Sequence, residues 1–120
     1  MSAKKTVQDF YKSDAFINPK AMENFLHKDL KIEWNSTKGF LILDKNAALE
    51  LTKQMSVAYV KSKIKISHII QKADMVSVRY AHYVKTIENP REEMLLAHFM
   101  VIWEIKDEKL FRGFQMSQLS

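Results

Sequence analysis

The sequence contains no cysteine, and it has only two glycine and two proline residues among its 120. Without cysteine, the chain has no disulfide, no thiolate zinc ligand and no cysteine nucleophile. No apolar run approaches the roughly 18 residues that a membrane-spanning helix needs, and the start MSAKKTVQDF lacks the apolar core of a secretion signal. We therefore expect a cytoplasmic protein with no membrane partner.

The sequence does have enough apolar residues to form one core. Hydrophobic residues make up 47% of the chain and charged residues 28%, a balance typical of a folded domain. No repeat, linker or low-complexity tract divides residues 1–120, and this length suits one domain. We predict a single domain over the whole chain.

The net charge of +5 raises the question of nucleic-acid binding. The basic residues are sixteen lysines and three arginines, whereas base and phosphate recognition favours arginine clustered with aromatic residues. In the densest group, Lys61, Lys63 and Lys65 alternate with other residue types, so that they share one face of a predicted strand. Lysines on an exposed strand indicate a solvated face that resists edge pairing. We predict no nucleic-acid partner.

Helical signals dominate the first half of the chain. Apolar residues recur at helical spacing over residues 7–15, and Asn18 before Pro19 is typical of the start of a second helix. Alternation over residues 30–35 predicts a short strand with one dry face. Asp44 then predicts the N-cap of a third helix, whose apolar residues lie on one side, as in a helix packed on a sheet.

The second half of the chain has the period of two that is typical of strands. Turn signals at residues 73–74, 89–92 and 107–108 divide it into four strands. Because these connections are short, we expect neighbouring strands to pair antiparallel.

The last hairpin predicts two faces of different character. If a two-residue turn pairs residues 106 and 109, His98 lies opposite Ser117 and Met100 lies opposite Gln115 on one face. The other face is apolar and pairs Phe99 with Met116, Val101 with Phe114, and Trp103 with Arg112. A guanidinium opposite an indole can lie over its ring. Since the helices need the first face, the second dry face predicts a homodimer interface.

Two helices, a short strand, a third helix and four long strands thus follow one another, with the strand VSVRYAHY and the final hairpin IWEIKDEKLFRGFQMSQL. This order resembles that of the ketosteroid isomerase and nuclear-transport-factor-two-like superfamily, which includes the SnoaL-like proteins. The resemblance implies an α+β fold of the cystatin-like roll type, in which a curved antiparallel sheet forms a cone around three helices from the N-terminal half. It also implies a mostly apolar pocket for a small ligand and a homodimer through the outer face of the sheet.

The catalytic acids of ketosteroid isomerase have no counterpart in this chain. By resemblance, the general base aspartate of that enzyme maps to Trp34 or Asn35, and its second acid maps to about Met100. Tyr11 matches the phenolic donor of the first helix, but one phenol without a base cannot shuttle a proton between carbons. We therefore predict that the protein is not a ketosteroid isomerase.

Three of the four histidines fall on successive predicted strands, in the phase assigned to the concave face: His68, His82 and His98. A histidine on an apolar face needs hydrogen-bond partners, and its pKa near neutrality makes it a candidate acid or base. The alternative is a core histidine that a tyrosine or a backbone carbonyl satisfies. No carboxylate shares this face and the spacing matches no zinc pattern, so we predict neither a metal nor another cofactor.

We predict that Tyr80, His82 and His98 are the catalytic residues, if the pocket has any chemistry. A tyrosine and a histidine in a dry pocket can polarise a carbonyl group or take a proton next to one. Scytalone dehydratase, a relative within the superfamily, works with the same residue types. The predicted ligand-binding residues are Tyr11, Trp34, Tyr59, His68, Met100, Gln115 and Ser117.

Three functions remain open from the sequence. The first is a SnoaL-like protein that binds a small apolar or aromatic molecule and acts on it as a lyase or an isomerase. The second is a non-catalytic ligand-binding or accessory protein. The third is a dimerisation module whose cavity is filled by its own side chains. An open cavity with converging polar groups favours the first function, and a filled core favours the third.

Overall fold

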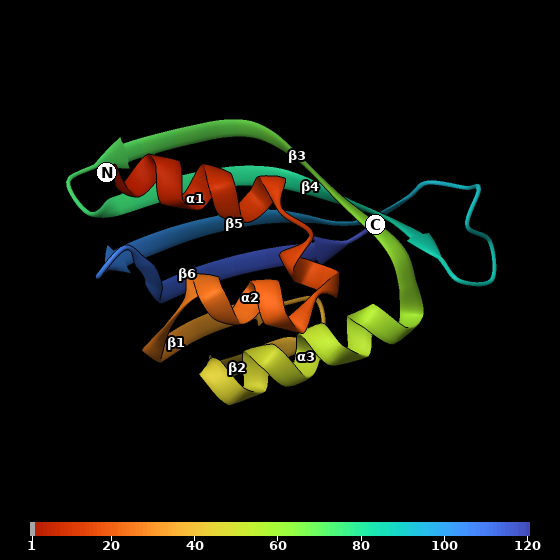
Figure 1. Cartoon of the computed structure of the whole chain (residues 1–120). Helices are drawn as coiled ribbons and strands as arrows, with labels where there is room; N and C mark the ends of the chain where they lie inside the picture. Colours follow the sequence, from red (N-terminus) through yellow and green to blue (C-terminus); the bar gives the residue numbers. More distant parts are fainter. Residues whose placement is uncertain (1) are drawn as a thin grey trace.

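The helices lie on one side of a curved sheet in the computed structural model, which describes residues 2–120 (Figure 1). The helical elements are α1 (Ala3–Lys12), the short 3-10 helix η1 (Ala15–Ile17), α2 (Pro19–Phe25) and α3 (Lys45–Ala58). The strands are β1 (Leu26–Ser36), β2 (Gly39–Asp44), β3 (Tyr59–Lys72), β4 (Met75–Thr86), β5 (Met94–Lys106) and β6 (Lys109–Leu119). The predicted α+β fold, with a curved sheet around three helices, is confirmed.

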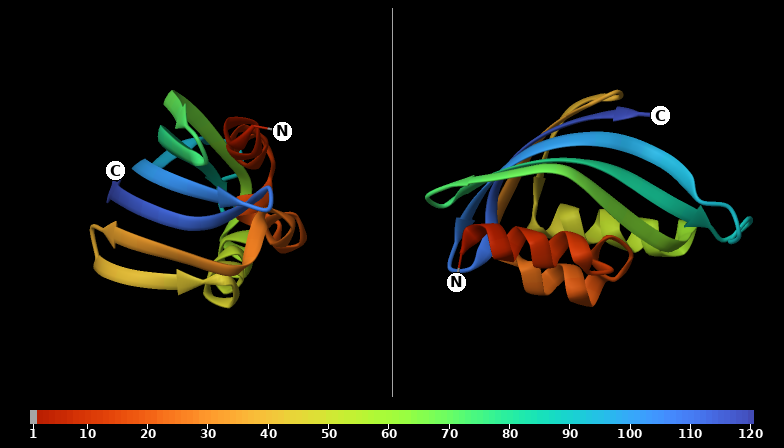
Figure 2. Two further views of the ribbon diagram at one scale, coloured as in Figure 1. Left: turned by 90° about the vertical axis from the view of Figure 1, so that its left-hand side faces the viewer. Right: turned by 90° about the horizontal axis from the view of Figure 1, so that it is seen from above.

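The six strands form one sheet in the order β2-β1-β6-β5-β4-β3. The sheet arches over the helices and does not close on itself, so β2 and β3 remain as its edges (Figure 2). All neighbours pair antiparallel except β1 and β6, which run parallel. Only antiparallel pairs were predicted from the sequence, because the short connections between successive strands allow no other pairing. Strands from opposite ends of the chain are free of that constraint.

Two helices begin at the caps that the sequence predicts. The Asn18 side chain accepts a hydrogen bond from the Ala21 N–H at 3.3 Å, and Pro19 follows it as the first residue of α2. The Asp44 carboxylate accepts one from the Ala47 N–H at 2.8 Å at the start of α3. Each cap satisfies a backbone donor that the helix itself cannot satisfy. These caps fix where the chain turns from extended to helical backbone.

Trp103 fills the end of the cone next to the β5–β6 turn. Its indole Nε1–H donates to the Tyr11 hydroxyl at 2.9 Å, and its ring meets Phe10 edge-on at a centroid distance of 6.2 Å. The ring also lies on Gly113, where a Cβ atom would be 2.6 Å from the indole. Glycine at this position therefore provides the space that the indole occupies.

The phase of β5 relative to β6 differs from the prediction. The two-residue turn is present as predicted, but a β-bulge at Phe111 then adds one residue to β6, so that Arg112 lies opposite Glu104 instead of Trp103. Successive side chains of a strand point to opposite faces, so one extra residue reverses the pairing of faces along the rest of the hairpin.

Five side chains of β5 consequently lie on the faces opposite to those predicted. Phe99, Val101 and Trp103, which were predicted to form the dimer interface, lie on the inner face, where Val101 and Trp103 are each 2% exposed. His98 and Met100, which were predicted to line the pocket, lie on the outer face, and Met100 is 58% exposed. The predicted positions of these five residues are wrong.

A second bulge, at Ser67 in β3, moves His68 away from the helices. Ile66 pairs with Tyr80, whose side chain is inside, whereas His68 pairs with Arg79 and is exposed on the outer face. The predicted placement of His68 in the pocket is therefore wrong. Alternation is undisturbed on each side of a bulge, so the sequence pattern does not reveal the change of face.

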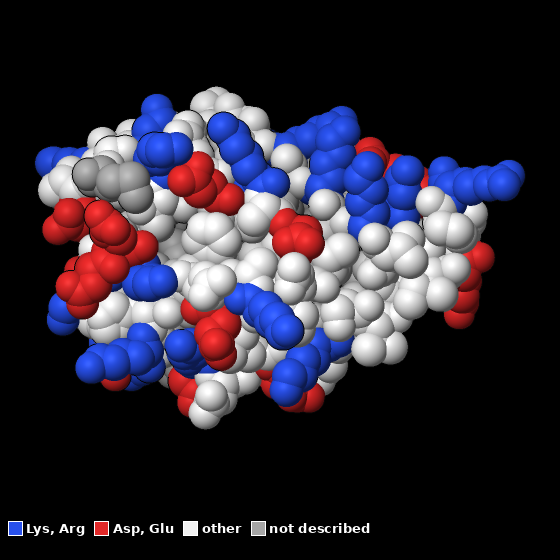
Figure 3. All heavy atoms as spheres, viewed as in Figure 1, with Lys and Arg blue, Asp and Glu red and all other residues white. Residues whose placement is uncertain are grey.

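Lys61, Lys63 and Lys65 lie exposed along the edge strand β3, as expected for a solvated face. Lys and Arg side chains gather at the upper right of Figure 3, where β3 and β4 lie in Figure 1. The Lys65 ammonium group lies 4.8 Å from the ring centroid of Tyr83 on β4. The absence of a nucleic-acid partner stays a prediction.

Candidate functional site

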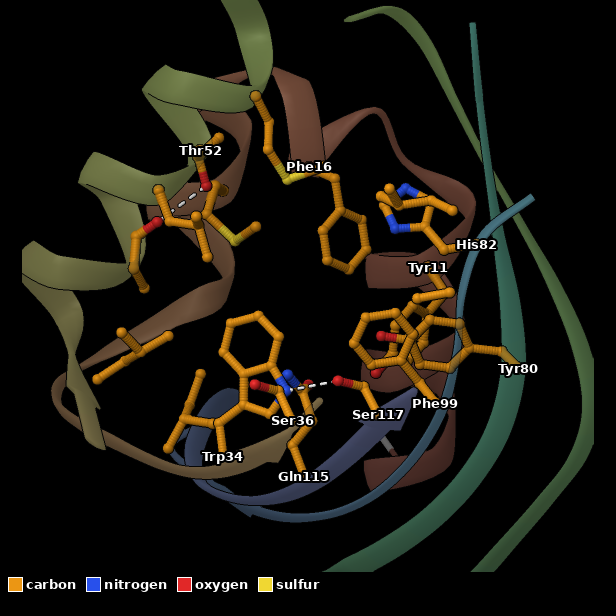
Figure 4. Close-up of a pocket in the computed structure, with 18 of the residues that line it drawn as sticks. Tyr11, Phe16, Trp34, Ser36, Thr52, Tyr80, His82, Phe99, Gln115 and Ser117 are labelled. Atoms are coloured by element: carbon orange, nitrogen blue, oxygen red, sulfur yellow. Dashed lines mark hydrogen bonds between the residues drawn. The ribbon is translucent and has the colours of Figure 1, made fainter. Parts of the chain in front are cut away.

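A cavity of about 240 Å³ lies between the concave face of the sheet and the helices (Figure 4). Most of its lining is aliphatic or aromatic, and α3 alone contributes Ala48, Leu51 and Met55. Among residues 2–120, the lining includes no carboxylate, and its one charged residue is the exposed Lys38. The interior is therefore a largely apolar environment that has a few neutral polar groups.

The structure brings together most of the residues that the sequence predicts for the pocket. The predicted residues that line the cavity are Tyr11, Trp34, Tyr80, His82, Gln115 and Ser117. Tyr59, at the junction of α3 and β3, does not line it, so its predicted ligand-binding position is wrong. His68, His98 and Met100 are excluded because they lie on the outer face.

Trp34 and Ser117 form a polar contact on one wall of the cavity. The Trp34 indole N–H donates to the Ser117 hydroxyl at 2.8 Å, and the parallel pairing of β1 with β6 places Trp34 beside Gln115 (Figure 4). The indole is thus fixed with its ring as a cavity wall. The Gln115 amide and the Ser117 hydroxyl both border the cavity, where they can serve as uncharged hydrogen-bonding groups.

Tyr11 and Tyr80 form a buried phenol pair beside Trp103. Their ring centroids are 4.6 Å apart, and Tyr80 also stacks on Phe99 at 4.9 Å. Burial raises the pKa of Tyr11 far above its ordinary value, although hydrogen bonds with Trp103 and Tyr80 oppose the shift. Burial and then the adjacent Tyr11 raise the pKa of Tyr80. Both phenols therefore keep their protons at neutral pH and act as hydrogen-bonding groups, not as bases.

His82 lies on the opposite side of the cavity from Trp34 (Figure 4). It is 2% exposed, and its ring lies 5.0 Å from the Phe16 ring and 6.3 Å from the Phe99 ring. The Ser62 hydroxyl oxygen is 2.6 Å from His82 Nε2. Burial lowers the pKa of His82 to about 4, so the imidazole is neutral at pH 7.

Several residues at this site were not predicted from the sequence. Phe99 and Trp103 border the cavity but were expected on the outer face, because the bulge in β6 was not foreseen. Phe16 was not singled out, and neither was Ser62. The sequence does contain a signal for Ser62, since the alternation that exposes the lysines of β3 turns this residue, with Ile64, toward the inside.

The fourth histidine, His27, does not line the cavity and has a structural role. Its Nδ1 accepts a hydrogen bond from the Asp29 N–H at 3.0 Å, and its Nε2 lies 3.2 Å from the Asp107 carboxylate. The ring also meets Phe111 edge-on at 4.8 Å. His27 thus links the start of β1 to the β5–β6 turn.

Residues 2–120 have neither a candidate metal site nor a candidate membrane-spanning helix. No group of three or more histidine, cysteine, aspartate or glutamate residues in this range could hold a metal ion. No helix in the same range is both long and apolar enough to cross a bilayer.

Similarity to known proteins is found in three-dimensional structure. No family model matches the sequence, and neither does any curated protein. The pinacolase BvnE from Penicillium brevicompactum has a TM-score of 0.76 at 12% identity, over 96% of this chain and 82% of that one. IdmH, a proposed polyketide cyclase from Streptomyces antibioticus, has a TM-score of 0.75 at 14% identity, over 98% and 92%.

The description of a third similar structure names its fold and no activity. It is a protein from Burkholderia pseudomallei described as NTF2-like, with a TM-score of 0.67 at 12% identity over 96% of this chain and 90% of that one. The chain has the NTF2-like fold. Further matches are described as a SnoaL-like polyketide cyclase and as a protein with a ketosteroid isomerase-like fold, which agrees with the resemblance seen in the sequence.

The burial of His82 predicts that the stability of this NTF2-like domain depends on pH. The pKa is about 4 in the folded chain and 6.5 for an unperturbed histidine, so the unfolded chain binds the proton more tightly. The free energy of unfolding should therefore fall by up to about 3 kcal/mol as the pH decreases from 7 to 4. Urea titrations across this range would measure it. His82→Gln is the control, because it removes the titrating group. If the native protein and this variant lose stability in parallel, His82 is not the cause of the pH dependence.

Proposed function

We propose that the protein binds a small, uncharged, largely apolar or aromatic molecule in the cavity. The observation that carries this proposal is the combination of a dry aromatic lining with a few neutral polar groups on opposite walls. The cavity volume of about 240 Å³ exceeds the roughly 150 Å³ of an engineered apolar cavity that takes up benzene. A compound of two fused rings is therefore a reasonable size for the ligand.

The electrostatics of the cavity favour a neutral ligand. A buried charge without a partner loses hydration that a protein interior does not replace. His82 is neutral at pH 7, the two phenols keep their protons, and the described lining offers no carboxylate. Lys38 is exposed, so it can meet only the part of a ligand that extends toward solvent.

The same groups suit a hydrogen bond to a carbonyl oxygen. A neutral imidazole or a phenol that donates to such an oxygen stabilises the negative charge that develops there when the adjacent C–H bond ionises. Lyase and isomerase reactions next to a carbonyl share this step. We therefore propose His82 and Tyr80 as the residues that act on the ligand. The enzyme names of two structural neighbours, a pinacolase and a proposed polyketide cyclase, agree with this proposal.

A non-catalytic binding protein is the second candidate, and a specific observation favours it. A pKa of about 4 makes His82 a weak base at neutral pH, and no carboxylate in the described lining could replace it. The Trp34 indole occupies the wall where the isomerase resemblance placed a general base. For these reasons we still expect that the protein does not isomerise ketosteroids, although Met100 lies on the outer face and has no part in this.

Ligand binding can be tested with a neutral fluorescent probe, N-phenyl-1-naphthylamine. The native protein should enhance its fluorescence and bind it saturably. Met55→Trp should weaken binding at least tenfold, because Met55 lines the cavity and the larger indole fills it. Lys53→Trp is the matched control, since Lys53 lies exposed on the same helix. Equal probe affinity in the two variants would contradict the proposed site.

The catalytic and non-catalytic candidates differ in hydrogen exchange. If His82 polarises a bound carbonyl, α-tetralone in D₂O should gain deuterium next to its carbonyl faster with protein than in buffer, with solvent taking the proton. His82→Phe should return the rate to that of buffer while the probe still binds. Proton NMR measures the exchange. Exchange that is no faster with the native protein would favour the non-catalytic candidate.

We also propose a homodimer through the outer face of the sheet. Large exposed apolar side chains gather there on three strands: Phe40, Ile42, Met100, Ile102, Phe114 and Met116. A surface of this kind on a soluble domain is typical of a protein interface. Phe114 and Met116 were predicted for it from the sequence. Arg112 lies instead over the Phe111 ring at 3.8 Å, so its predicted contact with Trp103 is wrong.

Charged substitutions at the centre of this face should produce monomers. Phe114→Lys combined with Met116→Lys places two charges where the proposed interface would bury them, so the molecular mass measured by light scattering at micromolar concentration should fall by half. Ile87→Lys is the control, because Ile87 is exposed beyond the end of β4. A native protein that is monomeric in the same measurement would refute the dimer.

A further inference from the structure

His82, which lines the cavity, is in contact with Ser62, which does not. Ser62 is half-buried on β3 and does not border the cavity, whereas His82 on the adjacent strand does. The Ser62 Oγ lies 2.6 Å from His82 Nε2. Ser62 thus occupies Nε2, and the other ring nitrogen, Nδ1, remains available to a ligand in the cavity.

The length of this contact indicates which atom donates. A separation of 2.6 Å is shorter than the roughly 2.7–3.2 Å usual for an N–H that donates to an oxygen, which favours the hydroxyl as the donor. Within residues 2–120, the Ser62 hydroxyl has no other side-chain or backbone acceptor in hydrogen-bond range. If the Ser62 O–H donates to Nε2, that nitrogen carries no proton.

A neutral imidazole has one N–H, so in that arrangement the proton of His82 is on Nδ1. This nitrogen has no hydrogen-bond partner in the described part of the chain. No fully buried side-chain nitrogen or oxygen of these residues lacks a partner, which means that Nδ1 reaches open space. His82 lines the cavity, and Figure 4 shows its ring beside Phe16 at the cavity wall.

We propose that Ser62 is a positioning residue that holds His82 in its Nδ1–H form, so that His82 presents a hydrogen-bond donor to the cavity and the ligand carries a neutral acceptor oxygen, such as a ketone carbonyl, at that point. The statement about the ligand rests on the proposed function. The statement about Ser62 and the tautomer does not, because it concerns the chain without a ligand. The opposite tautomer would make Nδ1 an acceptor and would select a hydroxyl group instead.

The tautomer can be read directly by NMR of protein labelled with ¹⁵N in histidine. In long-range ¹H–¹⁵N spectra the protonated and bare ring nitrogens have clearly different shifts, and His82→Gln identifies the His82 signals. At pH 7 the native protein should show His82 with a protonated Nδ1 and a bare Nε2. A protonated Nε2 in the native protein would overturn the proposal.

Three serine variants separate positioning from folding. Ser62→Ala should shift the His82 signals toward a mixture of both tautomers, and Ser62→Thr, which keeps the hydroxyl, should restore the native pattern. Ser67→Ala is the matched control, since Ser67 Oγ lies 3.0 Å from Nδ1 of the exposed His68 on the same strand. It should leave His82 unchanged. An unaltered Nδ1–H signal in a folded Ser62→Ala protein would overturn the positioning role.

The ligand statement is tested with two bicyclic probes, α-tetralone and tetralin, which differ by one carbonyl group. One neutral hydrogen bond should make the native protein bind the ketone about three- to tenfold tighter than the hydrocarbon, and Ser62→Ala should remove most of this preference. Equal affinities in the native protein would refute the acceptor oxygen. If neither probe binds, the proposed function and this part of the inference fail together, while the NMR result still decides the role of Ser62.

Discussion

The shape of the cavity depends on how the Trp103 indole packs between β5, β6 and α1. It crosses from β5 to α1 through its hydrogen bond to the Tyr11 hydroxyl, and it lies on Gly113, where a side chain would collide with it. A buried indole N–H without a partner would cost about 1–3 kcal/mol, so this contact also determines how α1 rests on the sheet. Tyr11 in turn packs against Tyr80. The end of the cone near the β5–β6 turn is therefore filled, and the open volume lies beyond this aromatic group.

Much of the fold could be predicted from the sequence because it depends on local signals. The caps at Asn18 and Asp44, the turns and the order of elements follow from short patterns that tertiary packing did not override. The segment Gly39–Asp44 was not predicted as a strand, since four apolar residues in a row do not alternate. The parallel pairing of β1 with β6 joins distant parts of the chain, and no local pattern specifies it.

The candidate site was predicted only where the strands kept their expected phase. Tyr80 and His82 on β4, and Gln115 and Ser117 on β6, line the cavity as expected, because alternation within each strand was interpreted correctly. The position of His98 was predicted wrongly. The bulge in β6 changes how that strand pairs with β5, while the alternation within each strand stays intact. Phe111, the extra residue of the bulge, packs against His27 and Arg112, and the contact with His27 joins distant parts of the chain that no local sequence pattern connects.

The apolar character of both faces of β5 does not depend on its phase. Phe99 and Trp103 occupy one set of alternate positions and Met100 and Ile102 the other, so the outer face of β5 is apolar in either phase. The sheet therefore has a second apolar face in either register, although half of the residues predicted for that face lie on the other one. The phase decides which kind of side chain goes where. On β5 the rings of Phe99 and Trp103 are inside, where they form part of the cavity wall, and Met100 and Ile102 are exposed outside.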